Sequence, residues 1–250
     1  MCIRDSPKTT IRVCNSLSCQ IYGSTKLKSI IIEKFEDQEV RVLDAPCMGR
    51  CASAPVLEIG HYHVENANLE KISEAVEIAK NSSEKPVILN DVGDNTGGGS
   101  SADSTFLLHE IIKQNVGNYC TVFFDPESVK ECVQKGIGKK VKLYVGGKVD
   151  DKHGEPVQIQ GIVKNITDGI WEDSEVRHGG YTKYNQGQTA LVETENDGSI
   201  ILTTLRQPPQ SIGQVTHIGI DPNKKQLITT RGVILPRPAY DPVSYTHLRA

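Results

Sequence analysis

The sequence has no long apolar run, no excess charge of one sign and no recognisable leader. No apolar stretch approaches the roughly 20 residues that a membrane-spanning helix needs, so the sequence predicts no membrane span. With 28 Lys and Arg against 31 Asp and Glu, the net charge is −3. The chain therefore has no excess of positive charge that would attract nucleic acid or an anionic membrane. The first residues lack the apolar core and cleavage site of a signal peptide. We therefore expect a cytoplasmic protein that binds no nucleic acid.

Both ends of the chain lack the patterns of a folded segment. Residues 1–6 and residues 242–250 resemble translations of transposon-end sequencing linkers. A match at both ends favours linkers over two ragged natural termini. Linker-derived segments are set aside before a fold is predicted, so the expected protein runs from Pro7 to Asp241. The reading frame is then expected to be a fragment from a library or a metagenomic assembly.

The length of 250 residues allows one large domain or two small ones. Hydrophobic periodicity in residues 7–80 predicts a small βαββα module. Its expected strands and helices, in chain order, are 9–14, 24–35 (helix), 39–45, 55–59 and 69–79 (helix).

Four cysteines of this first module form two pairs on its expected loops. They are Cys14, Cys19, Cys47 and Cys51. Neither pair has the two-residue spacing of a zinc ribbon or of a C-x-x-C redox dithiol, and no secretory signal supports structural disulfides. Each iron of a [2Fe–2S] cluster takes two cysteine sulfurs. The pattern therefore favours ligation of a [2Fe–2S] cluster over four cysteines that are paired by accident.

The cysteine segments carry a family resemblance. Residues 14–19 (CNSLSC) and 45–55 (APCMGRCASAP) resemble the thioredoxin-like [2Fe–2S] ferredoxins, especially the cluster domains of NADH-quinone oxidoreductase small subunits and NAD-dependent formate dehydrogenase beta subunits. Residues 58–63 (EIGHYH) are similar to the formate dehydrogenase version. The resemblance implies one-electron transfer to a flavin- and NADH-binding domain or subunit.

The pattern of residues 84–241 predicts a second module, which a polar hinge at 81–83 joins to the first. We expect a mixed α/β fold that becomes antiparallel in its second half. The expected strands are 85–92, 119–124, 140–145, 157–166, 189–193, 200–205 and 226–230, and the expected helices are one that opens at residues 101–104, one at 126–132 and one at 211–218. The two cysteines of this module, Cys120 and Cys132, are expected to be core thiols without chemistry.

A glycine-rich turn follows the first strand of the second module and precedes its first helix. Free backbone N–H groups converge at such a junction, but the turn lacks both the Lys-Ser/Thr of a Walker A loop and the G-x-G-x-x-G spacing. Its aspartates argue against a free phosphate. We expect the glycines to let a ligand, a metal-bound substrate or another domain approach the backbone; a tight turn with no ligand is the alternative. The candidate binding residues are Asp91, Asp94, Asn95, Gly97, Gly98, Gly99 and Asp103.

The same turn carries a second resemblance. Residues 90–105 (NDVGDNTGGGSSADST) resemble the C-terminal domain of the microcystinase C, or MlrC-like, zinc metallopeptidases, and residues 143–148, 218–222 and 237–240 support this. In that family a larger preceding domain carries the metal ligands, so the resemblance implies zinc only in that domain, which we interpret as missing here.

The histidines of the second module give no independent sign of a metal site. His109, His153, His178 and His217 are scattered and form no H-E-x-x-H motif. We therefore expect no complete catalytic constellation in this half of the chain, and its catalytic residues stay unassigned.

Two modules of different families in one chain favour a chimeric or fragmentary protein. One part is expected to be a [2Fe–2S] electron-transfer module, with a flavin- and NADH-binding oxidoreductase as its partner. The other is expected to be the accessory domain of a metallopeptidase, whose partner is the catalytic domain. A genuine fusion that acts as an iron–sulfur electron-transfer subunit and a non-catalytic binding module are the alternatives.

Overall fold

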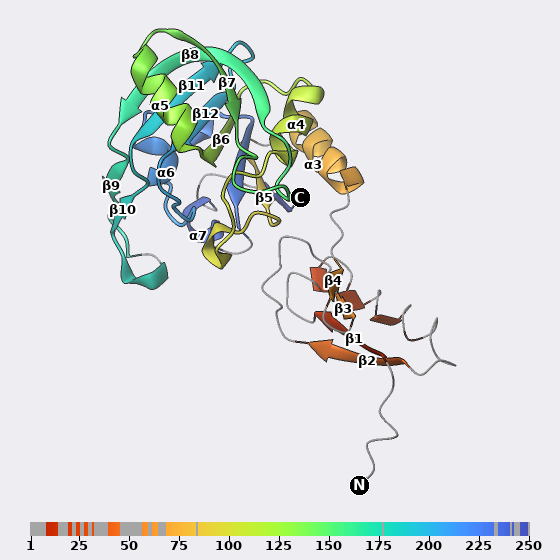
Figure 1. Ribbon diagram of the computed structural model, residues 1–250. Coiled ribbons are helices and arrows are strands. Elements are labelled where there is room, and N and C mark those ends of the chain that lie inside the picture. The colour runs from red at the N-terminus through yellow and green to blue at the C-terminus, as the bar shows by residue number, and fades with distance from the viewer. Residues whose placement is uncertain are drawn as a thin grey trace. The chain divides into compact units, whose positions relative to one another are not determined.

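Figure 1 shows the chain as a computed structural model, which divides into two compact units, Met1–Asn68 and Leu69–Ala250. The structure describes residues 9–14, 20–21, 24–25, 28–29, 32, 40–45, 57–59, 62–64, 69–83, 85–176, 178–232, 235–240, 242 and 246–249.

The first unit contains a four-stranded sheet in the order β2-β1-β3-β4. Its strands are β1 (Thr9–Cys14), β2 (Val40–Ala45), β3 (Leu57–Ile59) and β4 (Tyr62–Val64). β1 runs parallel to β2 and antiparallel to β3, as β3 does to β4. The three predicted strands are confirmed and β4 is additional. In the predicted helix 24–35, the residues that the structure describes are helical.

The second unit is built on an eight-stranded sheet in the order β14-β5-β13-β6-β12-β11-β8-β7. The first five strands of that order run parallel to one another, and the pairs from β12 to β7 are antiparallel. The mixed α/β prediction is confirmed. The strands are β5 (Val87–Asp91), β6 (Tyr119–Phe124), β7 (Lys140–Val145), β8 (Val157–Thr167), β11 (Thr189–Thr194), β12 (Ser199–Thr203), β13 (Leu227–Arg231) and β14 (Thr246–Arg249).

Helices cover both faces of this sheet (Figure 1). Side chains alternate across a strand, and β5 accordingly sends Val87 and Leu89 into one core cluster and Ile88 into the other. The first cluster includes residues of α3, α4 and α5, and the second includes residues of α6 and α7. The helices are α3 (Leu69–Asn81), α4 (Phe106–Lys113), α5 (Pro126–Lys135), α6 (Gly213–Thr216) and α7 (Arg237–Tyr240), with 3₁₀ turns η3 (Thr96–Gly98), η4 (His178–Gly180) and η5 (Pro222–Lys224).

A small hairpin of β9 (Ile170–Glu172) and β10 (Lys183–Asn185) leaves the main sheet, and the sequence did not predict it. The Trp171 indole stacks between Tyr184 and His217, with ring centroids 5.3 and 5.0 Å away. Its Nε1–H donates to Ser211 Oγ at 2.9 Å. The chain's only tryptophan is therefore buried in the second unit.

Helix α3 belongs structurally to the second unit, although its sequence predicts the last helix of the first module. Val76 is fully buried in the first core cluster. Ser73 Oγ donates to Glu110 Oε1 at 3.0 Å, and Gln226 Nε2 donates to the Ala79 carbonyl at 2.8 Å. The division between the units therefore falls between Asn68 and Leu69 rather than at the predicted hinge, because the apolar face of α3 packs on α4 and β5.

The last residues, which the sequence predicts to be linker-derived, include a strand. Residues 246–249 form β14, which pairs in parallel with β5 at the edge of the sheet.

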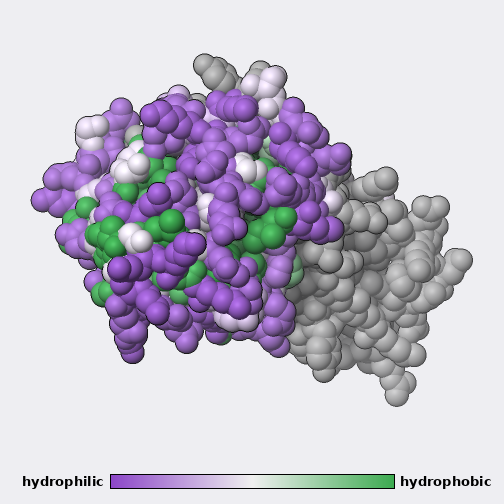
Figure 2. Space-filling view, turned by 90° about the horizontal axis from the view of Figure 1, so that it is seen from above, coloured by the Kyte–Doolittle hydropathy of each residue, from purple (hydrophilic) through white to green (hydrophobic). Residues whose placement is uncertain are grey.

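The surface of the second unit is mainly polar on the face that Figure 2 shows. Hydrophobic residues form small groups separated by hydrophilic ones on that face. Among the described residues, every helix is too short or too polar to cross a lipid bilayer.

Candidate site at the carboxyl edge of the parallel strands

The carboxyl ends of four parallel strands meet at one edge of the second sheet. β5 ends at Asp91 beside Arg231 of β13, and β6 ends at Phe124 beside Thr203 of β12. Ligands of open α/β sheets bind at this edge, where the loops that follow the strands converge. The predicted glycine-rich turn is one of these loops.

Asp94 closes the glycine-rich turn at its base. The carboxylate is fully buried; its Oδ1 accepts the Ala102 N–H at 2.7 Å, and its Oδ2 accepts the Ser104 N–H at 2.8 Å. Arg231 Nη1 donates to the same Oδ2 at 2.6 Å. Three charge-assisted hydrogen bonds thus fix the two ends of segment 95–101 against each other.

Arg231 is held as firmly as its partner. Its Nε donates to the Val122 carbonyl at 2.9 Å and its Nη2 to the Ser104 carbonyl at 3.1 Å. The guanidinium carbon lies 4.5 Å from the Phe123 ring centroid. A buried ion pair is stable only when hydrogen bonds satisfy both groups, and this one meets that condition.

The two carboxylates beside Arg231 have opposite pKa shifts. Asp91 accepts the Asp94 N–H at 3.0 Å, and its Oδ2 lies 3.7 Å from Arg231 Nη1. Burial and the negative charge of Asp94 raise the pKa of Asp91. Burial also acts to raise the pKa of Asp94, but Arg231 and the Ser104 and Ala102 amides outweigh it and lower that pKa. The negative charge of the site is therefore concentrated on Asp94.

The glycines of the turn are exposed. Thr96–Gly98 form η3, and the Asn95 carbonyl accepts the N–H groups of Gly98 and Ser100. Gly99 has φ +91° and open space where a Cβ would be, so it needs glycine for its backbone conformation rather than for lack of room. The turn therefore presents its backbone from a rigid base.

Asp103 has a different set of partners. Its Oδ2 accepts the N–H groups of Lys148 and Val149 at 2.8 and 3.0 Å, and its buried Oδ1 has no partner among the described residues. The Gly147 N–H donates to the Asp103 carbonyl. The structure thus brings Asp91 and Asp94 together around Arg231, whereas Asp103 fastens the loop between β7 and β8.

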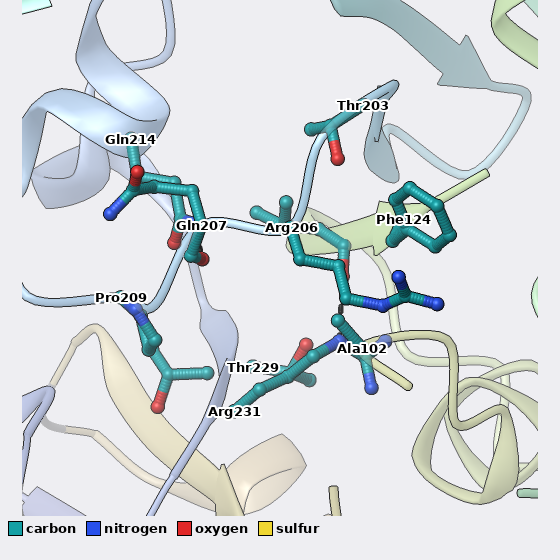
Figure 3. Close-up of a pocket in the computed structure, with 11 residues that line it drawn as sticks. Ala102, Phe124, Thr203, Arg206, Gln207, Pro209, Gln214, Thr229 and Arg231 are labelled. Atoms are coloured by element: carbon teal, nitrogen blue, oxygen red, sulfur yellow. Dashed lines mark hydrogen bonds between the residues drawn. The ribbon is translucent and has the colours of Figure 1, made fainter. Parts of the chain in front are cut away.

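A shallow pocket opens beside the network (Figure 3). The Arg206 guanidinium lies over the Phe124 ring at 3.9 Å, and its Nε donates to the Ser101 carbonyl at 2.9 Å. The cavity volume is about 20 Å³, whereas pockets for small molecules hold about 300–1,000 Å³. The pocket admits a water or two, and a substrate would have to lie over this edge rather than inside it.

Sequence reasoning missed both arginines. Arg231 directly follows a run of buried strand residues, and a charged residue at the end of a buried strand is a signal that could have found it. Arg206 lies in an exposed loop, for which we find no sequence signal.

The sequence also missed a line of three polar side chains beside the turn. Ser100 Oγ lies 3.1 Å from His153 Nε2, and His153 Nδ1 lies 2.7 Å from Asp150 Oδ1. His153, which the sequence placed in no motif, therefore lies beside the turn. The expectation of no complete catalytic constellation in this half of the chain stays a prediction.

The cysteines of the first unit can be placed only in part. Cys14 is buried at the end of β1 and pairs with Ala45 at the end of the parallel β2. Cys19, Cys47 and Cys51 lie outside the described residues. The prediction that the four cysteines hold one cluster therefore stays a prediction. In the part of the chain that the structure describes, no group of three or more His, Cys, Asp or Glu is arranged to hold a metal ion.

Comparison with known families identifies two regions. A family model for the MlrC C-terminus matches residues 89–250, and one for the thioredoxin-like [2Fe–2S] ferredoxins matches residues 3–80. Microcystinase C of Sphingomonas sp is 25% identical over 157 residues, which are 62% of this chain and 30% of that protein. A subunit of NADH-quinone oxidoreductase from Rickettsia felis (strain ATCC VR-1525 / URRWXCal2) is 28% identical over 78 residues, which are 28% of this chain and 47% of that protein.

Two further comparisons agree. The same NADH-quinone oxidoreductase component of Rickettsia bellii (strain RML369-C) is 27% identical over 82 residues, covering 30% of this chain and 49% of that protein. The crystal structure of a candidate metallopeptidase from Mesorhizobium sp. BNC1 matches with a TM-score of 0.64 at 17% identity, over 74% of this chain and 37% of that one. That likeness establishes the fold alone. The chain spans less than half of each of these relatives.

Proposed function

The chain belongs to the MlrC C-terminus family, and from that premise we propose that residues 84–241 act as the accessory domain of an MlrC-like zinc metallopeptidase. In this proposal zinc is held by a separate catalytic domain. The accessory domain offers its glycine-rich turn to a substrate or to that domain.

The observation that carries this proposal is the Asp94–Arg231 network beneath the turn. Ordering a loop on binding costs free energy that a preformed loop does not lose. Because Asp94 already ties the turn at both ends, the exposed backbone of Gly97–Gly99 can be approached without further ordering. Such a preformed, side-chain-free surface suits close contact with a peptide backbone or with another domain.

A binding experiment tests the proposal. The full chain would be titrated into the part of Sphingomonas microcystinase C that precedes the matched region, with calorimetry as the readout. We expect binding by the wild type, a loss of at least tenfold in affinity for Asn95→Ala and Asp94→Ala, and wild-type affinity for the distant Asn223→Ala. Absence of binding, or equal binding by all variants, would leave the turn as a structural element only.

For residues 7–80 we propose one-electron transfer through a [2Fe–2S] cluster held by the four cysteines of the first module, toward a flavin- and NADH-binding oxidoreductase partner. The family match over residues 3–80 and the Cys14–Ala45 pairing support it. Thiolate ligands suit the soft iron sites. After anaerobic reconstitution we expect coloured protein with iron and sulfide, which Cys47→Ser loses and Cys132→Ser keeps. Colourless wild-type protein would reject the cluster.

We propose that the two modules were joined artificially, as a chimera. A genuine fusion is the alternative, and one observation supports that alternative. The ferredoxin match reaches residue 80, yet α3 packs into the second unit from Leu69 onward. The ferredoxin family model thus includes α3, although α3 packs against the second unit. We expect such an arrangement in two modules that have evolved together in one protein. Sequencing the DNA across codons 65–90 in independent clones decides between the two, because a chimera predicts that the junction does not recur.

A further inference from the structure

We propose that Ser100, His153 and Asp150 form a serine-type acyl-transfer site beside the glycine-rich turn. The Ser100 Oγ to His153 Nε2 distance is 3.1 Å, and the His153 Nδ1 to Asp150 Oδ1 distance is 2.7 Å. A hydroxyl, an imidazole and a carboxylate in this order are the arrangement that activates a serine nucleophile, and it is recognised by geometry rather than by chain order. This activity requires no zinc and is independent of the function proposed above.

The direction of the hydrogen bonds follows from the chemistry of the three groups. An ionised carboxylate only accepts hydrogen bonds, so His153 Nδ1 carries the proton that Asp150 accepts. In the neutral imidazole Nε2 is then an acceptor, and the Ser100 hydroxyl donates to it. Burial acts to raise the pKa of Asp150, but hydrogen bonds from His153 and the Lys152 amide outweigh it and lower the pKa. Asp150 therefore stays ionised and fixes the tautomer that His153 needs as a base.

The loop that carries His153 and Asp150 is fixed against the start of α4. The Thr105 N–H donates to the His153 carbonyl at 2.9 Å, and Thr105 Oγ1 donates to the Glu155 carbonyl at 2.8 Å. Asp103 holds the other end of the loop through Lys148 and Val149. The imidazole is thus positioned by backbone contacts that a side-chain substitution at residue 153 would leave in place.

The site is open to solvent on one side. Ser100 is half-buried, and the side chains of His153 and Asp150 are 16% and 35% exposed. Gly99, directly before the nucleophile, has nothing within 4 Å of the place where a Cβ would be. The N–H of Ser101 donates to no acceptor in the described part of the chain. A backbone N–H on the residue after the nucleophile is a common oxyanion donor in serine hydrolases.

The reaction that this arrangement supports is the hydrolysis of an ester. Ser100 Oγ attacks the carbonyl carbon while its proton passes to His153 Nε2. The carbon–oxygen bond to the leaving alkoxide then breaks, and His153 returns the proton to that alkoxide. Water attacks the acyl-serine, His153 accepts a proton from it and gives it back to Ser100 Oγ, and the acid is released. Ester and water are consumed, and acid and alcohol are formed.

The competing account is a purely structural link. The Ser100 hydroxyl also approaches Asp94, and when it donates its single proton to that carboxylate it lowers the pKa of Asp94 and no longer donates to His153. A serine that only bridges Asp94 and His153 would fasten the turn without reacting. Covalent chemistry at Ser100 separates the two accounts.

The test uses the full chain and a fluorophosphonate, which transfers its phosphonyl group to an activated serine with loss of fluoride. Intact-mass spectrometry should show one added phosphonyl group on the wild type and none on Ser100→Ala. General-base catalysis contributes about 100-fold or more, so we expect labelling of His153→Ala to be at least 100-fold slower. His109→Ala removes an exposed histidine that has a backbone contact, and this variant should label at the wild-type rate.

Asp150 acts through His153, so it is a positioning residue and needs its own readout. Asp150→Asn should slow labelling strongly, because the amide favours the wrong tautomer, and Asp150→Glu should restore part of the rate. Trp171 fluorescence checks that each variant is folded. A metal chelator should not change the labelling rate, which separates this site from any zinc-dependent cleavage. Unlabelled wild type, a label retained in Ser100→Ala, or equal rates for the Asp150 variants would overturn the proposal.

Discussion

Replacing Asp94 by alanine should produce one of the largest losses of stability that a single substitution can cause in the second unit. The change removes the acceptor of three charge-assisted hydrogen bonds, from Arg231, Ala102 and Ser104. It also leaves Arg231, whose side chain is 9% exposed, with a buried charge whose short ion pair is gone. Breaking a buried pair by removing one partner costs about 3–5 kcal/mol. We expect Asp94→Ala to lower the unfolding free energy by about 4 kcal/mol.

Urea unfolding followed by Trp171 fluorescence measures this loss, because the only tryptophan lies in the second unit. The exposed Asp151→Ala is the matched control and should change stability by no more than about 0.5 kcal/mol. The double variant Asp94→Leu with Arg231→Met should cost less than the two single changes together, since neither charge is then left alone. A loss below about 1 kcal/mol for Asp94→Ala would refute the claim that the network holds the turn.

The difference in unfolding free energy between the wild type and an Asp94 variant should depend on pH with a definite sign. The folded-state pKa of Asp94 is lowered, so its contribution is present above the ordinary aspartate pKa and is lost as the pH falls through the folded-state value. The stability gap between the wild type and Asp94→Asn should therefore be constant near neutral pH and shrink only in acid. If the stability difference narrowed between about pH 6 and pH 8, a group that titrates there, such as a histidine, would be responsible for it instead of Asp94.

Three further predictions concern packing and reactivity. Val76→Asp should destabilise the second unit, as followed by Trp171 fluorescence, by about 3 kcal/mol or more, because it buries a charge under α3. The substitution Glu77→Ala at the exposed neighbouring position should have little effect. Equal melting curves for the two variants would mean that α3 does not belong to this unit. Gly146→Ala should lower the melting temperature, since φ is +65° and the Cβ would lie 2.6 Å from the Asp103 carbonyl oxygen; an unchanged melting temperature would contradict this. Burial raises the pKa of Cys120 to about 12, so iodoacetamide should modify it only after unfolding, as peptide mass mapping would show.

The sequence was sufficient wherever a local pattern decides the structure. Strands β6 and β7 begin and end at the predicted residues, because alternation or continuous burial marks them within a few positions. The start of α5 was equally readable, and Asp125 accepts the Ser128 N–H ahead of a proline in the first turn.

The elements that escaped prediction depend on partners far away in the chain. Asp94 and Arg231 are 137 positions apart, and Ser100 and His153 are 53 apart. No pattern along the chain encodes such pairs, since they form only when the sheet brings the loops to one edge. The same holds for α3, whose periodicity predicted a helix but not the unit against which its apolar face packs.

The closure of the turn by Asp94 has a consequence for how this protein could change over time. Segment 95–101 leaves and re-enters the fold at points that are fixed by Asp94, Ala102 and Ser104. Lengthening a flexible loop between fixed ends is inexpensive, about 0.6 kcal/mol for each doubling of its length. Substitutions and insertions between those ends can therefore alter what the edge recognises while the sheet beneath stays intact. The buried ion pair thus allows the exposed part of this segment, Gly97–Gly99, to change in sequence and length without loss of the sheet.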